Sequence, residues 1–126
     1  MEVKINTKEK FHVITLPGPT LSATMTEELS DRLLSFLQND VKNIVLDLNL
    51  VQSLDNNSAE TLVKVQQKFY ESNASFVICR VQPHVEEFMD KQNLLELMNT
   101  APTESEAWDI VQMEEIEREL MDDETL

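Results

Sequence analysis

The sequence predicts an α/β domain whose sheet is mixed but mostly parallel. Residues 43–48 and 75–79 form nearly continuous apolar runs, which is typical of parallel strands covered on both faces. Segments whose apolar residues recur at helical spacing lie between and after these runs. The predicted order is strand, strand, helix, strand, helix, strand, helix, strand, helix. This alternation favours one layered domain with about four helices, and a length of 126 residues suits a single domain.

The N-terminal residues predict two short strands joined by a hairpin turn. Apolar and polar residues alternate over 3–5 and again over 11–15, and the polar residues 6–10 between them form the expected turn. Pro17-Gly18-Pro19 ends the second strand, because proline removes a donor from the strand ladder.

A first helix is expected to begin near Thr24 and to end at Asn39-Asp40. Thr24 and Glu27 have the spacing of a capping box, in which a hydroxyl and a carboxylate three residues later satisfy the first N–H groups. The apolar residues of this segment recur at helical spacing: Met25, Leu29, Leu33, Phe36 and Leu37.

The central strand, 43–48, leads through a polar turn into a second predicted helix from about Asn57 to Ser72. Asn73 is a suitable residue for a left-handed helix end, since asparagine tolerates positive φ. The strand 75–79 follows directly, so the chain returns to the sheet after this helix.

The C-terminal third predicts two more helices and one short strand. Pro83 is expected to open a helix that runs to about Lys91. Residues 94–98 fit either a strand or a helix, and their place between two helices favours a strand. Thr103 and Glu106 have capping-box spacing and predict the start of the last helix. Charge density rises after residue 113, so 1–113 is predicted as the domain and 114–126 as an acidic helical extension that frays from Met121 onward.

The charge balance excludes several classes of partner. Ten Lys plus Arg against 24 Asp plus Glu give a net charge of -14, which repels nucleic-acid phosphates and anionic lipid headgroups. The same charge either attracts a basic patch on a protein partner or simply solvates the surface. We find no signal peptide and no run long enough to span a membrane, so a cytoplasmic protein is expected.

The residues that usually carry chemistry are scattered. Cys79 lies in an apolar run, and neither His12 nor His84 is placed beside it by the sequence, so a buried structural cysteine is expected. There is no metal-ligand spacing and no nucleophile elbow. Gly18 is the only glycine, which disfavours a glycine-rich phosphate loop. Trp108 is expected to pack rather than to bind a ligand. We therefore predict no catalysis, no metal and no cofactor.

Three segments in this order resemble the STAS domain, the fold of bacterial anti-sigma factor antagonists. The first is Gly18 with the helix start behind it. The second is Ile44-Val-Leu-Asp-Leu48 followed by Asp55 and a helix, where the family has a strand, an Asp-Ser-Ser/Thr-Gly turn and a leucine-rich helix. The third is Pro102-Thr103-Glu-Ser-Glu-Ala107, which resembles the start of the family's last helix. The resemblance covers roughly residues 2–113 and implies a STAS-like fold.

The resemblance also implies a site at Asp55, Asn56, Asn57 and Ser58. In the family this turn holds a serine or threonine that a partner kinase phosphorylates. Aligned on Asp55, that position is Asn57, which has no hydroxyl; Asn57 is instead expected to act as an N-cap, with Glu60 completing a capping box. Ser58, in the glycine position, is a candidate phosphorylation site, and Asp55 either contacts a partner or stabilises the turn.

The implied function is that of a non-catalytic regulatory protein. On this interpretation the chain binds an anti-sigma factor or a serine kinase through the turn and the helix that follows. Two alternatives stay open. The chain is a small structural STAS subunit of a larger complex, such as a lipid-transport ATPase, or it is a nucleotide-binding module, which the shortage of glycine disfavours.

Overall fold

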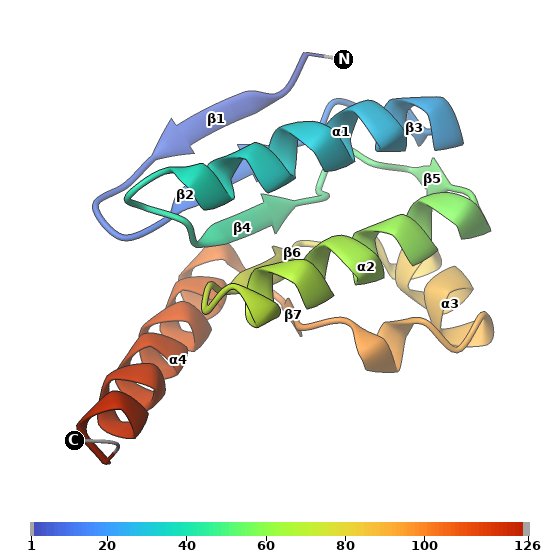
Figure 1. The fold of residues 1–126 in the computed structure, drawn as a ribbon. Coiled ribbons are helices and arrows are strands. Elements are labelled where there is room, and N and C mark those ends of the chain that lie inside the picture. Colours follow the sequence, from blue (N-terminus) through green and yellow to red (C-terminus); the bar gives the residue numbers. More distant parts are fainter. Residues whose placement is uncertain (1, 125–126) are drawn as a thin grey trace.

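The computed structural model describes residues 2–124, which form a five-stranded sheet with helices on both faces (Figure 1). The strand order is β1-β2-β4-β6-β7; β1 and β2 are antiparallel and all other neighbours are parallel. The sheet strands are β1 Lys4–Thr7, β2 His12–Thr15, β4 Ile44–Asp47, β6 Phe76–Cys79 and β7 Thr100–Ala101. The helices are α1 Ala23–Ser35, α2 Asn56–Glu71, α3 Pro83–Lys91 and α4 Glu104–Glu124. The predicted fold class is confirmed.

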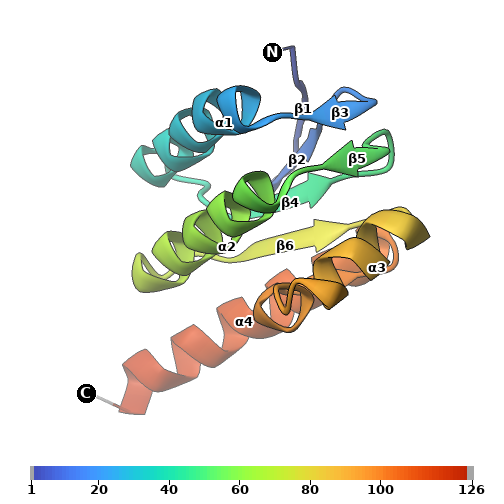
Figure 2. The same ribbon diagram turned by 90° about the vertical axis from the view of Figure 1, so that its right-hand side faces the viewer.

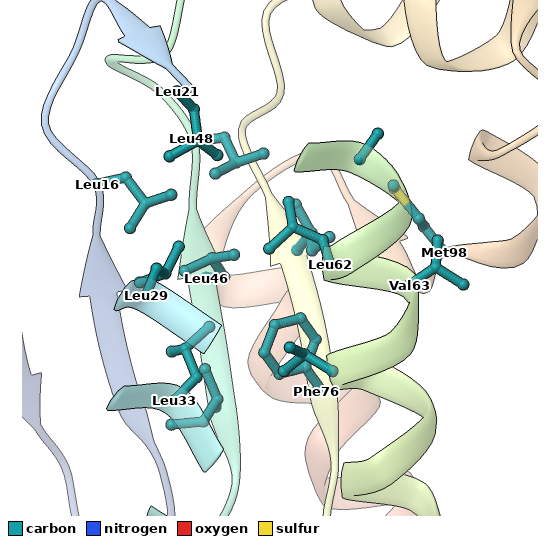
Figure 3. Close-up of a cluster of buried hydrophobic side chains, with 14 of the residues drawn as sticks. Leu16, Leu21, Leu29, Leu33, Leu46, Leu48, Leu62, Val63, Phe76 and Met98 are labelled. Atoms are coloured by element: carbon teal, nitrogen blue, oxygen red, sulfur yellow. The ribbon is translucent and has the colours of Figure 1, made fainter. Parts of the chain in front are cut away.

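The central strands are buried on both faces, as their continuous apolar sequences predict. Every residue of β4 and β6 is buried, and alternate side chains enter two separate clusters. The larger cluster lies under α1, α2 and α3, and includes Leu46 and Phe76 (Figure 3). The smaller cluster contains Val45 and Val77 and is covered by α4. Figure 2 shows α1 and α2 on one side of the sheet and α4 on the other.

A second, very small sheet lies beyond the carboxyl ends of the parallel strands. It pairs β3 Thr20–Leu21 with β5 Ser53–Leu54 in parallel. Gly18 makes the approach to this sheet possible, because a Cβ there would lie 1.9 Å from the carbonyl oxygen of Leu50. The sequence does not predict either strand, since two residues are too few to show a periodic pattern.

Two predictions about local structure were wrong. α1 begins at Ala23 and is capped by Ser22, whose Oγ accepts the N–H of Met25 at 3.3 Å, so Thr24 is inside the helix and is not its cap. Residues 94–98 contain a 3₁₀ helix, η2 (Leu95–Leu97), where we expected a strand. This segment satisfies its own backbone through short-range bonds, such as the N–H of Met98 to the carbonyl of Leu95 at 3.0 Å.

The other predicted ends agree with the structure. Asn73 has a φ of 60°, as expected for a left-handed helix end, and α3 begins at Pro83. The main α1 helix ends at Ser35 and continues as a 3₁₀ turn, η1 (Phe36–Gln38), before the predicted stop at Asn39.

α4 runs without a break across residue 113, where the sequence places the end of the domain. Beyond that point Glu115 accepts a hydrogen bond from the buried Asn43 at 2.7 Å, and Arg118 donates one to Ser75 at 3.1 Å. Residues of the predicted extension therefore form hydrogen bonds to Asn43 and Ser75, which lie immediately before β4 and β6. Thr125 and Leu126 lie outside the described residues, and the fraying of the tail stays a prediction.

Candidate functional site

The predicted turn is the start of α2, and Asp55 is its N-cap. The Asp55 backbone is extended, with φ -88° and ψ 171°, and its Oδ1 accepts the backbone N–H of Ser58 at 2.7 Å. The carbonyl of Asp55 accepts the N–H of Ala59 at 3.1 Å. A carboxylate in this position satisfies an N–H group that has no partner within the helix and complements the helix dipole.

The hydrogen bonds to Asp55 favour its charged form. The backbone N–H of Ser58 lowers the pKa of the Asp55 carboxyl, with further contributions from the Ser58 side chain and the backbone N–H of Ala23. Ala23 is the first residue of α1, so the carboxylate lies beside the starts of two helices. Asp55 is exposed, and this places a fixed negative charge at the surface between α1 and α2.

The prediction that Asn57 caps α2 is wrong, because Asp55 already occupies that position. Asn57 lies inside the first turn, where its carbonyl accepts the hydroxyl of Thr61 at 2.9 Å. Its side chain is exposed. Glu60 is engaged by Asn56, whose Nδ2 donates to Oε1 at 2.9 Å, and not by Asn57. The start of α2 therefore presents a neutral amide side chain to the solvent.

Ser58 points in the opposite direction, into the contact between α1 and α2. It is fully buried. Its Oγ lies 2.8 Å from the hydroxyl of Thr26 and 3.2 Å from the carbonyl of Leu21, and the Thr26 hydroxyl lies 2.7 Å from the carbonyl of Ser22. Each hydroxyl has one proton, so two arrangements are possible. Either Thr26 donates to Ser58 and Ser58 donates to the carbonyl of Leu21, or Ser58 donates to Thr26 and Thr26 donates to the carbonyl of Ser22. A phosphate on Ser58 has no room unless α1 and α2 separate.

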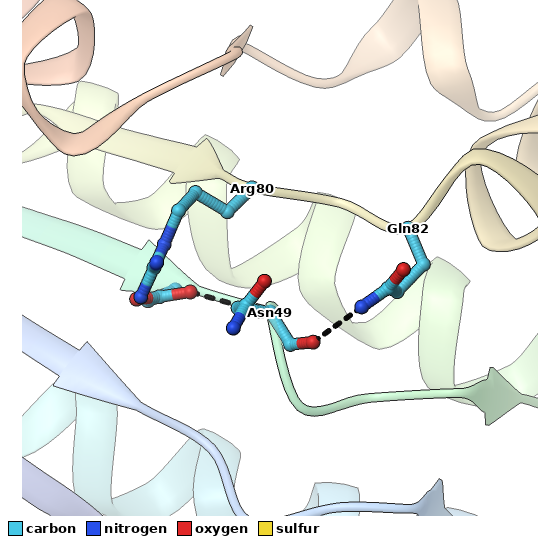
Figure 4. A network of polar contacts seen from close by, with 4 residues as sticks. Asn49, Arg80 and Gln82 are labelled. Atoms are coloured by element: carbon cyan, nitrogen blue, oxygen red, sulfur yellow. Dashed lines mark hydrogen bonds and ion pairs between the residues drawn. The ribbon is translucent and has the colours of Figure 1, made fainter.

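A polar network that the sequence does not predict fixes the loop leading to this turn (Figure 4). Asp47, buried at the end of β4, accepts the backbone N–H of Asn49 at 2.8 Å and forms an ion pair with Arg80. The hydrogen bond to Asp47 raises the pKa of Arg80, which keeps it charged. Gln82 donates from Nε2 to the carbonyl of Asn49 at 2.6 Å. The loop between β4 and β5 is thus tied to the segment that enters α3.

A shallow groove of about 160 Å³ continues this surface from the loop to α3. The Nε2 of His84 lies 2.5 Å from the carbonyl of Gln52 across one end of it. Its apolar lining comes from Leu54, Val85 and Phe88. Leu54 immediately precedes Asp55, so the groove adjoins the cap of α2. No sequence motif indicates this groove, because its residues come from segments about 30 positions apart.

Cys79 and Trp108, whose side chains could in principle carry other chemistry, are packed into the protein. Cys79 is buried, and this burial, with a contribution from the charge of Asp47, raises the pKa of its thiol to about 12, so it stays protonated. Trp108 stacks on Phe11 with ring centroids 4.6 Å apart, which confirms packing. Within residues 2–124 no group of three or more His, Cys, Asp or Glu side chains is arranged to hold a metal. None of the described helices combines the length and the apolarity that a membrane crossing needs.

This fold and the sequence that forms it are similar to those of known proteins. The family model of the STAS domain matches residues 2–107. No curated protein matches the chain. Among solved structures, a putative anti-sigma factor antagonist from Thermotoga maritima has a TM-score of 0.76 and 21% identity, over 87% of this chain and 94% of that one. An anti-sigma-factor antagonist (STAS) domain protein from Planctomyces limnophilus has a TM-score of 0.74 and 21% identity, over 87% and 97%.

A third match is the Bacillus cell fate determinant SpoIIAA in its phosphorylated form. It has a TM-score of 0.64 and 18% identity, over 87% of this chain and 99% of that one. At these identities the three structures establish the fold and its shared topology.

Proposed function

The chain belongs to the STAS domain family, and on that premise we propose that it is a regulatory module that binds a protein partner through the start of α2. The partner is an anti-sigma factor or a serine kinase, and the setting is the cytoplasm. The binding surface consists of the exposed turn at Asp55 and Asn57 and the groove beside it. Asp55 and Asn57 are exposed, and the Asp47 network ties the loop before the turn to the segment that enters α3, which suits docking.

The observation that carries the proposal is the exposed Asn57 in the position that the resemblance assigns to a phosphoacceptor. Phosphorylation adds about -1.5 to -2 charges at a helix start and can repel an acidic partner surface. Asn57 has no hydroxyl, so this position keeps the uncharged state permanently. Ser58, the neighbouring hydroxyl, is buried against Thr26. The module therefore binds without being switched off by a kinase at this turn.

The proposed module is not an enzyme. The one thiol of the chain is Cys79, buried and protonated, and the exposed residues at the turn, Asp55 and Asn57, carry neither a hydroxyl nor a thiol. A contact surface accounts for these residues without a reaction or a cofactor.

A binding measurement with the purified cognate anti-sigma factor or kinase tests the proposal. The substitution Asn57→Asp adds one negative charge at the turn and should weaken binding about tenfold. The matched control is Gln67→Glu, which adds the same charge to an exposed position of the same helix and should leave the affinity unchanged. Equal affinities for all three chains would remove the turn from the interface.

Incubation with the kinase and ATP tests the missing switch separately. The native chain should take up no phosphate, whereas Asn57→Ser should be phosphorylated at residue 57. Phosphate on Ser58 of the native chain would contradict the proposal that this turn cannot be switched.

The alternative is a structural subunit of a larger complex, such as a lipid-transport ATPase. A permanently unmodified turn at Asn57 also suits a constitutive contact. Co-purification separates the two functions: a stoichiometric ATPase subunit favours the alternative, and a kinase or anti-sigma factor favours the regulatory module.

A further inference from the structure

The outer face of α4 carries an apolar stripe that the fold does not use. Met113, Ile116, Leu120 and Met121 are 61, 56, 58 and 66% exposed. Three of them stand at positions i, i+3 and i+7, which align on one side of a helix. These residues lie beyond 107, where the match to the STAS family model ends, so the stripe belongs to this chain's own continuation of the helix.

Most of the stripe points away from the sheet, and Ile116 lies at its edge, where it lines a hollow of about 420 Å³ together with Lys10 and Trp108. The inner side of α4 is defined by Ala107 and Val111, which are fully buried, and by Arg118, which binds Ser75. At about 100° per residue, Met113 lies roughly 200° round the helix from Val111. Packing against the sheet therefore fixes the helix in an orientation that presents the stripe to the solvent.

Acidic side chains surround this stripe. Asp109 is exposed one turn before Met113, and Glu117 and Glu119 are exposed beside Ile116 and Leu120. Over its whole length α4 contains ten carboxylates and a single cation, Arg118. A second copy of the helix would bring like charges together around the contact, and an anionic membrane would repel it. The surface that complements the stripe is apolar at its centre and basic at its rim.

We propose that the outer face of α4 docks into an apolar groove rimmed by Lys or Arg on a protein partner. Anchors at i, i+3 and i+7 are the spacing by which amphipathic helices are read in grooves. Residues 113 to 121 span roughly 12 Å of helix at 1.5 Å per residue, which suits a short groove. The charges around the stripe orient the helix and speed association, and the three anchors supply the buried apolar area.

This surface is separate from the turn at Asp55. In Figure 1 the C-terminal end of α4 lies at the lower left and the β5–α2 turn at the right of the molecule. The stripe therefore offers a second docking site, which does not rest on the proposed function of the turn. A chain with Asn57→Asp should bind the α4 partner with unchanged affinity.

Photo-crosslinking of the full chain in its native cells identifies what covers the stripe. A benzophenone amino acid replaces Ile116, and the control carries it at Gln67, an exposed position on α2. We expect an adduct with one protein from position 116 that is absent from position 67. An adduct with a second copy of the chain, an adduct with lipid, or no adduct above the control overturns the proposal.

Titration with the purified adduct partner completes the test. The pair Ile116→Ser and Leu120→Ser should weaken binding at least tenfold, and the charge reversal Glu117→Lys with Asp109→Lys should also weaken it and flatten its dependence on salt. Leu97→Ser is the control, because Leu97 is a similarly exposed leucine at 51% outside α4. Circular dichroism checks that α4 stays helical in each variant. Unchanged affinity for the Ile116/Leu120 variant overturns the proposal.

Discussion

Asp55 combines two effects in one side chain, a hydrogen-bonded cap and a charge at a helix start. The two can be separated, because asparagine caps a helix about as well as aspartate but carries no charge. Asp55→Ala removes both and should lower the free energy of unfolding by about 1 kcal/mol at pH 7. Asp55→Asn should lose only the charge contribution and stay closer to the native chain. Urea denaturation of the three chains at pH 7 measures both differences.

The dependence on pH follows from the lowered pKa of Asp55. A carboxyl whose pKa is lower in the folded state stabilises the fold above its unfolded pKa of 3.8, and this contribution disappears as the pH falls through the folded value. The difference between the native chain and Asp55→Asn should therefore be constant above about pH 5 and vanish in stronger acid. A difference in the free energy of unfolding that persists at pH 2 would mean that it does not arise from the charge of Asp55.

The sequence predicted where α2 begins more reliably than the role of each residue at its start. A polar turn between an apolar strand and an amphipathic helix was sufficient to place a helix start near Asp55. The observed cap, Asp55, lies two positions before the predicted cap, Asn57. Several consecutive polar residues can each cap a helix, so the sequence does not single out one of them. The burial of Ser58 was available from the sequence, because Ser58 is four residues before Leu62 and shares its inward face.

At the scale of elements, α4 is the part whose role the sequence described least well. Its charged residues after 113 indicate a solvated extension, yet Glu114 accepts the hydroxyl of Tyr70 at 2.7 Å, Glu115 binds Asn43 and Arg118 binds Ser75. Charged residues on the inner side of a helix are indistinguishable by composition from those on its outer side. Only the positions of their partners, in α2 and immediately before β4 and β6, reveal their function.

Truncation tests whether the domain ends at residue 113, as the sequence predicts. A chain that ends at Met113 loses the contacts of Glu114, Glu115 and Arg118, and its free energy of unfolding should fall by about 3 kcal/mol if each hydrogen bond contributes about 1 kcal/mol. A chain that ends at Glu119 keeps all three contacts and is the control. It should unfold at the same urea concentration as the native chain within error. Equal stability of the two shortened chains would support the predicted end of the domain at 113.

Elements long enough to show a periodic pattern of apolar residues were predicted well, and shorter elements were not. The hairpin, the two central strands and the helices at 56–71 and 83–91 follow from alternation or helical spacing. β3, β5 and β7 have two residues each, and their pairing depends on backbone bonds to strands distant in the sequence. The 3₁₀ helix at Leu95–Leu97 replaced the expected strand because β7 starts three residues after it, at Thr100, and is the segment that pairs with β6.

At the scale of the whole molecule, the net charge of -14 opposes compaction. Carboxylates crowd one another in the folded state more than in the expanded chain, and salt screens this repulsion over a Debye length of about 10 Å at 0.1 M. We therefore expect the melting temperature at pH 7 to rise by several degrees when NaCl is raised from about 10 to 150 mM. Over this range of salt, the change in melting temperature reports the screening of charge.

The same titration near pH 4.3, the isoelectric point of the sequence, provides the control for this prediction. There the net charge is close to zero, so salt has little repulsion to screen and the melting temperature should stay flat. A decrease with salt at pH 7 would mean that attractive pairs such as Asp47 with Arg80 outweigh the excess of carboxylates. Differential scanning calorimetry at both pH values distinguishes these outcomes, and it does so independently of any partner.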